Sequence, residues 1–132
     1  MPAEEQLRVA ALLKAVLDEF DARSAARVSE HADRGVDGLK AALLSDAEHT
    51  MAHRGLATPH VVLQAEHLAG DGEVRARFVA RNRALRHAFA ERLGPDRATE
   101  LLAFPEGALT LWLLDPETVD LRAPYEGYLR RL

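Results

Sequence analysis

Apolar residues recur at helical spacing along almost the whole chain, and Gly and Pro interrupt that spacing at a few places. The interruptions lie at residues 35–38, 54–59, 70–72, 94–95 and 115–116. A clear example of the spacing is the stripe formed by Val9, Leu13, Val16, Leu17 and Phe20. Residues three and four apart share one side of a helix, so each segment can bury one face. The sequence therefore predicts an all-α bundle of about five to six helices.

The expected helices form a single domain over residues 1–132. Their predicted ranges are about 3 to the late 20s, 36–53, 58–70, 72–93, 96–114 and 124–132. The third helix is predicted to start at Thr58-Pro59, a capping hydroxyl followed by a proline at the first helical position. Pro105 lies inside the fifth segment and predicts a kink, or a break that opens another helix. Residues 108–114 also alternate like a strand, but the sequence offers no second strand to pair with them.

Composition limits the class of protein. The 132 residues suit one core, and the absence of cysteine excludes disulfide and thiol chemistry. The net charge of −4 lowers the expectation of a DNA-gripping surface. The charged start and the lack of a long apolar run predict no signal peptide and no membrane contact, hence a cytoplasmic protein. The bias toward Ala, Arg, Leu and Gly is typical of a GC-rich bacterial genome.

Four segments carry a family resemblance through their order and spacing. They are LLKAVLDE at 12–19, HTMAHRGL at 49–56, GEVRARFVARNRAL at 72–85 and GALTLWLLDP at 107–116, followed by Val119-Asp120-Leu121. Together they resemble the C-terminal, effector-sensing and dimer-forming half of TetR-family transcriptional regulators. Two departures are Arg54, where the family often has proline, and Pro105, which interrupts a helix that the family usually keeps continuous.

The resemblance implies a homodimer in which residues 73–93 and 97–114 pair across a two-fold axis. The residues expected at that interface are Ala80, Ala84, Ala88, Phe89, Leu109 and Trp112. The three alanines recur every four residues and form a smooth ridge, which helix propensity alone would also explain. Phe89 and Trp112 are either interface anchors or ordinary core residues.

The resemblance also implies a pocket for a small apolar or amphipathic ligand between the first four helices. The expected lining residues are Phe20, Met51, Leu63, Gln64, His67, Phe78 and Asn82. Gln64 and Asn82 can each donate and accept hydrogen bonds, which suits the orientation of a ligand. The residues ahead of Leu12 are too few for the family's helix-turn-helix DNA reader, so this chain is not expected to bind DNA directly. It would act by holding a ligand or by pairing with a full-length relative.

Two other functions remain open. His49 and His53 share one helix face, as do His60 and His67, so a small helical metal-binding protein or metalloenzyme is an alternative. A plain helical interaction module without a pocket is another. The sequence contains no catalytic constellation, and we expect neither enzymatic activity nor a cofactor.

Overall fold

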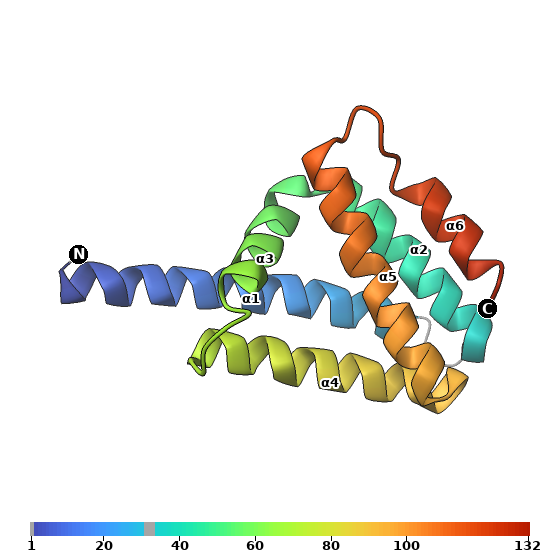
Figure 1. Ribbon diagram of the computed structural model, residues 1–132, viewed down its shortest axis with the longest axis horizontal. Coiled ribbons are helices and arrows are strands. Elements are labelled where there is room, and N and C mark those ends of the chain that lie inside the picture. The colour runs from blue at the N-terminus through green and yellow to red at the C-terminus, as the bar shows by residue number, and fades with distance from the viewer. Residues whose placement is uncertain (1, 31–33) are drawn as a thin grey trace.

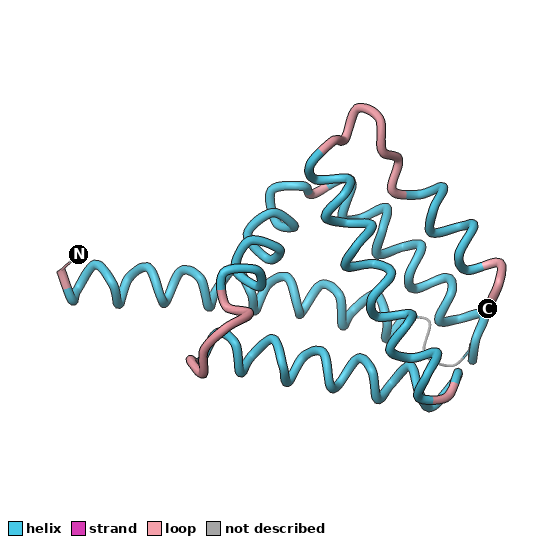
Figure 2. Tube along the Cα trace, viewed as in Figure 1, coloured by secondary structure: helices cyan, strands magenta, loops and turns pink. Residues whose placement is uncertain are grey.

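Six α-helices follow one another in the computed structural model, which describes residues 2–30 and 34–132 (Figure 1). They are α1 (Ala3–Glu30), α2 (Gly35–Ala52), α3 (Arg54–Glu66), α4 (Glu73–Leu93), α5 (Pro95–Leu114) and α6 (Arg122–Leu129). Turns and loops join these helices (Figure 2), and this part of the chain contains no strand. The all-α bundle predicted from the spacing is confirmed.

The helices α4 and α5 make the most extensive helix–helix contact in the described part of the chain. They are joined at Gly94, whose φ of 84° lies in the left-handed region that favours glycine. Pro95 follows directly as the first residue of α5, where its fixed φ suits a helix start and its missing N–H has little cost. The N-terminal part of α1 extends beyond the rest of the bundle (Figure 1), and Leu7 and Leu12 are exposed there.

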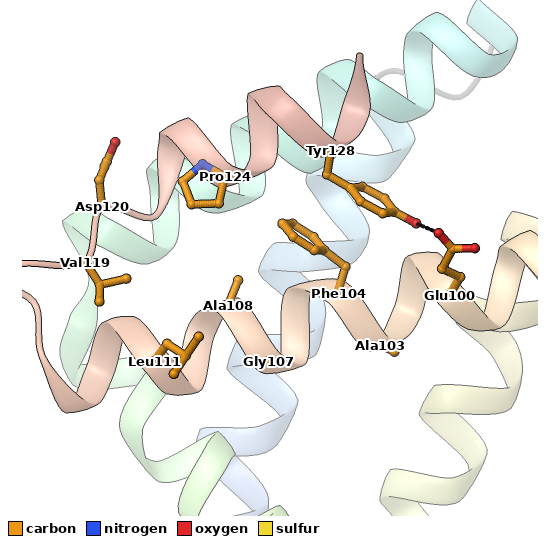
Figure 3. Close-up of a pocket in the computed structure, with 10 residues that line it drawn as sticks. All are labelled: Glu100, Ala103, Phe104, Gly107, Ala108, Leu111, Val119, Asp120, Pro124 and Tyr128. Carbon is orange, nitrogen blue, oxygen red and sulfur yellow. Dashed lines mark hydrogen bonds between the residues drawn. The ribbon is translucent and has the colours of Figure 1, made fainter. Parts of the chain in front are cut away.

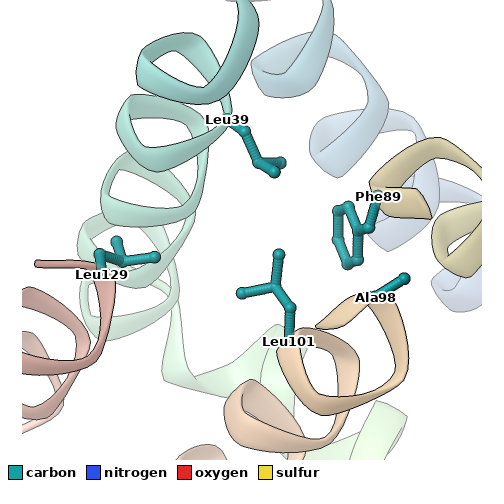
Figure 4. Packing of buried hydrophobic residues seen from close by; sticks show 5 residues of the cluster. All are labelled: Leu39, Phe89, Ala98, Leu101 and Leu129. Carbon is teal, nitrogen blue, oxygen red and sulfur yellow. The ribbon is translucent and has the colours of Figure 1, made fainter. Parts of the chain in front are cut away.

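An apolar core, which we call the main core, joins four helices at one end of the bundle (Figure 4). Its buried members are Leu39 from α2, Phe89 from α4, Ala98 and Leu101 from α5, and Leu129 from α6. Ala98 and Leu101 have no exposed surface. A second apolar cluster continues between α2, α5 and the C-terminal segment, with Ala47, Trp112, Leu121 and Tyr125 at its centre. Burial raises the pKa of Tyr125 and keeps its hydroxyl protonated.

The helix α3 begins four residues earlier than predicted, at Arg54. Thr58 does not cap the helix, because its hydroxyl donates instead to the carbonyl of Arg54 at 3.3 Å. Arg54 also donates from Nη2 to the carbonyl of Leu113 at 2.7 Å, and its guanidinium lies 5.7 Å from the ring centroid of Trp112. This contact ties the start of α3 to the end of α5, and the sequence pattern gave no sign of it.

The helix α5 runs without a break from Pro95 to Leu114. The predicted break at Pro105 is therefore wrong. Proline removes one backbone donor, but contacts on both sides hold the helix together. Ala98 and Leu101 before Pro105 are buried in the main core, and Trp112 after it is buried in the second cluster.

Candidate functional site

Charged, polar and aromatic side chains meet where α1, α3, α4 and α5 come together. We call this cluster the polar junction. It consists of Asp18, Phe20 and Asp21 from α1, His60 and Gln64 from α3, Arg77, Phe78 and Arg81 from α4, and Glu106 from α5. The polar members on α1, α3 and α4 are three or four positions apart, which places them on one face of each helix, and α5 contributes Glu106 alone.

Two arginines of α4 join the other helices through ion pairs. Arg77 Nη2 lies 2.7 Å from Asp18 Oδ1 and 2.9 Å from Asp21 Oδ2. One turn later, Arg81 Nε lies 3.3 Å from Asp21 Oδ1, and Arg81 Nη1 lies 3.6 Å from Glu106 Oε1. Arg81 therefore connects α4 to both α1 and α5, and only 19% of its side chain is exposed.

The ion pairs change the acidity of the groups that form them. Hydrogen bonds from Lys14 and then from Arg77 lower the pKa of Asp18 below its ordinary value. Burial alone would lower the pKa of Arg77, but the hydrogen bonds to Asp18 and Asp21 outweigh that effect and raise the pKa. Three carboxylates face Arg77, Arg81 and Lys14, so the charges around the junction balance.

His60 lies at the centre of the junction with 1% of its surface exposed. Its ring stacks on Phe20 with centroids 4.2 Å apart, and it meets the ring of Phe78 edge-on at 5.2 Å. Burial, assisted by the nearby positive charge of Arg81, lowers the pKa of His60 to about 3. The imidazole is therefore neutral at physiological pH, so one of its nitrogens is a donor and the other an acceptor.

Three buried polar atoms of the junction have no hydrogen-bond partner among the described residues. They are Asp21 Oδ1, His60 Nδ1 and Gln64 Oε1. Asp21 Oδ1 is compensated by the charge of Arg81 at 3.3 Å. The other two atoms belong to neutral groups and have no such compensation. Buried polar atoms are normally hydrogen-bonded, so these two mark unused binding capacity.

The structure brings together four of the residues that were predicted to line a ligand pocket: Phe20, Leu63, Gln64 and Phe78. Leu63 and Phe78 are buried in a small apolar cluster with Leu17, next to the ring stack. Gln64 Nε2 donates to Glu106 Oε2 at 3.2 Å.

The other three predicted lining residues are engaged elsewhere or lie at the edge. Met51 packs against the second apolar cluster around Trp112 rather than beside Phe78. His67 Nδ1 lies 2.7 Å from the carbonyl of Leu63 in its own helix. Asn82 Oδ1 accepts a hydrogen bond from Arg81 Nη1 at 3.2 Å, so it touches the junction from the side.

The predicted interface residues fall into two groups. Ala80 and Ala84 are exposed on α4, and Ala88 and Leu109 are half-buried. Phe89 and Trp112 are 5% and 7% exposed and belong to the apolar cores of this chain. They are therefore core residues rather than anchors for a second copy, because a side chain already covered by its own chain has little surface left to bury.

A groove of about 510 Å³ runs between α5 and the C-terminal segment (Figure 3). Ala103, Gly107 and Leu111 form part of its α5 wall, and Val119, Pro124 and Tyr128 lie opposite. The rings of Phe104 and Tyr128 stack with centroids 4.4 Å apart. The groove contains none of the residues predicted to bind a ligand. Near the junction, in contrast, Phe20, Leu56 and Ala57 line a hollow of only about 10 Å³.

The two histidine pairs do not converge on a metal. His49 and His53 stack on each other with centroids 4.1 Å apart, while His60 is enclosed by aromatic rings. Within residues 2–30 and 34–132, no group of three or more His, Asp or Glu side chains is arranged to hold an ion. The geometry thus gives no support to the metalloprotein alternative.

The fold and site define a small helical bundle with a charge-balanced polar junction. No family model, curated protein or solved structure matches this chain. Among the helices that the structure describes, none has both the length and the apolar character needed to cross a membrane.

Sequence reasoning missed Asp18, Asp21, Arg77, Arg81 and Glu106 as parts of the site and considered His60 as a candidate metal ligand. A local signal for two of them existed, because Arg77 and Arg81 are one turn apart, as charged residues that face a common partner should be. Glu106 had no such signal, since its partners are 25 and 42 residues away in sequence.

Proposed function

We propose that this chain is a small-molecule-sensing, dimer-forming regulatory domain of the TetR type. The exposed face of the α4–α5 pair carries this proposal. These two helices pack extensively on each other, yet their outer surfaces expose small residues, including Ala80 and Ala84 on α4 and Ala103 and Gly107 on α5. Small residues allow the helices of a second copy to approach closely.

Exposed leucines on the same helix support the dimer. Leu111 and Leu114, at the end of α5, are 59% and 78% exposed. Leu111 also lines the groove of Figure 3, together with Ala103 and Gly107. A stable dimer buries about 800 Å² on each partner. Ala103, Gly107 and Leu111 are exposed on α5 and also line the groove, so a single contact could cover both.

The sensing part of the proposal rests on the polar junction. It joins the long helix α1 to α3, α4 and α5, and it contains buried polar atoms that have no hydrogen-bond partner among the described residues. A molecule bound there would change contacts between α1 and the proposed dimer helices. In the TetR family, the helix that α1 resembles leads from the sensing domain to the DNA reader. A change in the contacts of α1 would therefore transmit ligand binding toward the DNA reader of such a protein.

Native mass spectrometry of the purified chain tests the dimer. We expect a mass of twice 14.5 kDa. Leu111→Glu should shift the population to monomer, because it places a charge in an apolar contact. The matched control is Leu68→Glu, since Leu68 is 73% exposed on the loop after α3. A monomeric wild-type protein, or a Leu111→Glu variant that remains dimeric, would contradict the proposal.

A further inference from the structure

His60 and Gln64 lie one turn apart on α3 and face the polar junction. His60 is held between Phe20 of α1 and Phe78 of α4. Gln64 is held by its amide nitrogen, which donates to Glu106 of α5 at 3.2 Å. Both side chains therefore have fixed positions, set by three different helices.

Each of the two side chains has one buried hydrogen-bonding atom left over. Because Gln64 Nε2 donates to a carboxylate, Gln64 Oε1 is fixed as an acceptor that lacks a donor. His60 Nδ1 is also buried and has no hydrogen-bond partner in the described part of the chain. A hydroxyl group matches this pair, since it can donate its proton to Gln64 Oε1 and accept one from His60 Nδ1–H.

The surroundings select against a charged molecule. Arg77 and Arg81 are already paired with carboxylates from α1 and α5. The imidazole of His60 is neutral and provides no charge for an anion. Phe20 and Phe78 contact the His60 ring, and Leu63 belongs to the same apolar cluster as Phe78. An uncharged apolar or aromatic body that carries a hydroxyl fits both the polar and the apolar parts of the site.

We propose, on the basis of the sensor function above, that His60 and Gln64 form a buried recognition site for the hydroxyl group of a small, uncharged, apolar molecule. Phe20 controls access to the site. Its ring covers His60 at 4.2 Å and also lines the neighbouring hollow. The other residues of that hollow are Arg23, His49, Thr50, His53, Leu56 and Ala57. Because the hollow measures only about 10 Å³, a ligand that reaches the recognition pair has to displace the Phe20 ring from His60.

Phenol and toluene are suitable probes, because they have similar shapes and only phenol has a hydroxyl. NMR titration of the full chain would follow the imidazole nitrogens of His60. Phenol should shift these signals with a dissociation constant on the order of 1 mM. Toluene should bind at least about tenfold more weakly, because it leaves both buried atoms unpaired. Equal binding of the two probes, or no response to phenol, overturns the proposal.

Gln64→Met removes the acceptor and keeps a similar length. This variant should bind phenol about tenfold more weakly and toluene unchanged. Gln6→Met is the matched control, since Gln6 is exposed on the extended part of α1 and should leave phenol binding unaltered. Unchanged phenol binding by Gln64→Met contradicts the proposal. If that variant fails to fold, the ratio of the dissociation constants of phenol and toluene for the wild type tests the proposal.

The mass of the protein separates this inference from the sensor proposal. A dimeric protein that binds phenol and toluene equally well would refute only the hydroxyl site. A monomer would refute the proposed regulatory domain, whatever the binding result.

Discussion

The main core and the polar junction hold the bundle together in different ways. The main core is built from Leu39, Phe89, Ala98, Leu101 and Leu129, and every one of these side chains is apolar. The polar junction is built mostly from ion pairs, aromatic rings and a neutral histidine. Apolar contacts lose stability in proportion to the surface and volume removed, whereas a paired charge leaves an uncompensated partner behind when it is deleted.

The two regions also differ in whether their buried hydrogen-bonding groups are satisfied. The main core has little hydrogen-bonding capacity to offer, because its side chains are apolar. The junction has two neutral buried atoms, His60 Nδ1 and Gln64 Oε1, that no described residue satisfies. A protein that keeps unpaired polar atoms in its interior pays for them in stability, so such atoms indicate a site that serves binding rather than packing.

Leu101→Ala in the main core should have the largest effect on stability. Leu101 is fully buried, so its truncation removes apolar contacts and leaves a cavity. We expect the free energy of unfolding, measured by urea denaturation, to fall by about 3 kcal/mol. Leu68→Ala is the control and should change it by less than about 0.5 kcal/mol, because Leu68 is largely exposed. Equal losses in the two variants would show that the main core is not the stabilising centre.

Arg81→Met tests the junction in the same assay. The substitution keeps an apolar stem but removes the charge that faces Asp21 and Glu106. Because the side chain of Arg81 is about one fifth exposed, water compensates part of the loss. We expect a destabilisation of about 2 kcal/mol, smaller than that of Leu101→Ala. A neutral or stabilising result would mean that the ion pairs only offset their own desolvation.

The pH dependence of stability should come in part from His60. Its pKa is about 3 in the folded chain and 6.5 in its ordinary state. Between these two values the unfolded chain binds the proton and the folded chain does not, so stability falls as the pH falls from 6.5 toward 3. His60 therefore lowers the free energy of unfolding progressively as the pH falls through that window, and its contribution does not vary with pH above 6.5.

His60→Phe isolates this contribution. Phenylalanine can keep the contacts with Phe20 and Phe78 and removes the unpaired Nδ1. At neutral pH the variant should be more stable than the wild type by about 1 kcal/mol. The difference should grow as the pH is lowered from 6.5, when urea midpoints are compared across a pH series. If the stabilities of the two proteins changed with pH in parallel, His60 would be excluded as a source of the pH dependence.

The sequence predicted the helices well because helical spacing is a local property. The ends of α1, α2, α4 and α5 fall within a few residues of the predicted ranges. The start of α3 was wrong because it depends on a contact between Arg54 and the carbonyl of Leu113, far away in sequence. The continuity of α5 through Pro105 also depends on buried contacts on both sides of the proline.

The site was predictable only in part, for the same reason. Phe20, Leu63, Gln64 and Phe78 were grouped only through the resemblance to a family. The ion pairs that connect α4 to α1 and α5 depend on the relative placement of helices, which local spacing does not define. The groove between α5 and the C-terminal segment was missed because its walls are brought together by tertiary packing.

Arg122→Met should have the smallest effect and sharpens the contrast with Arg81. Arg122 also pairs with two carboxylates, since its Nε lies 2.7 Å from Glu126 Oε1 and its Nη1 contacts Glu48 on α2. However, 51% of its side chain is exposed, so water replaces those partners when the charge is removed. We expect no change in melting temperature beyond experimental error, at either low or high salt.

If Arg122→Met destabilised the chain as much as Arg81→Met, burial would not be what distinguishes the polar junction from the surface. The ion pairs of the junction would then be ordinary surface contacts, and the argument for a specialised interior site would rest on His60 and Gln64 alone.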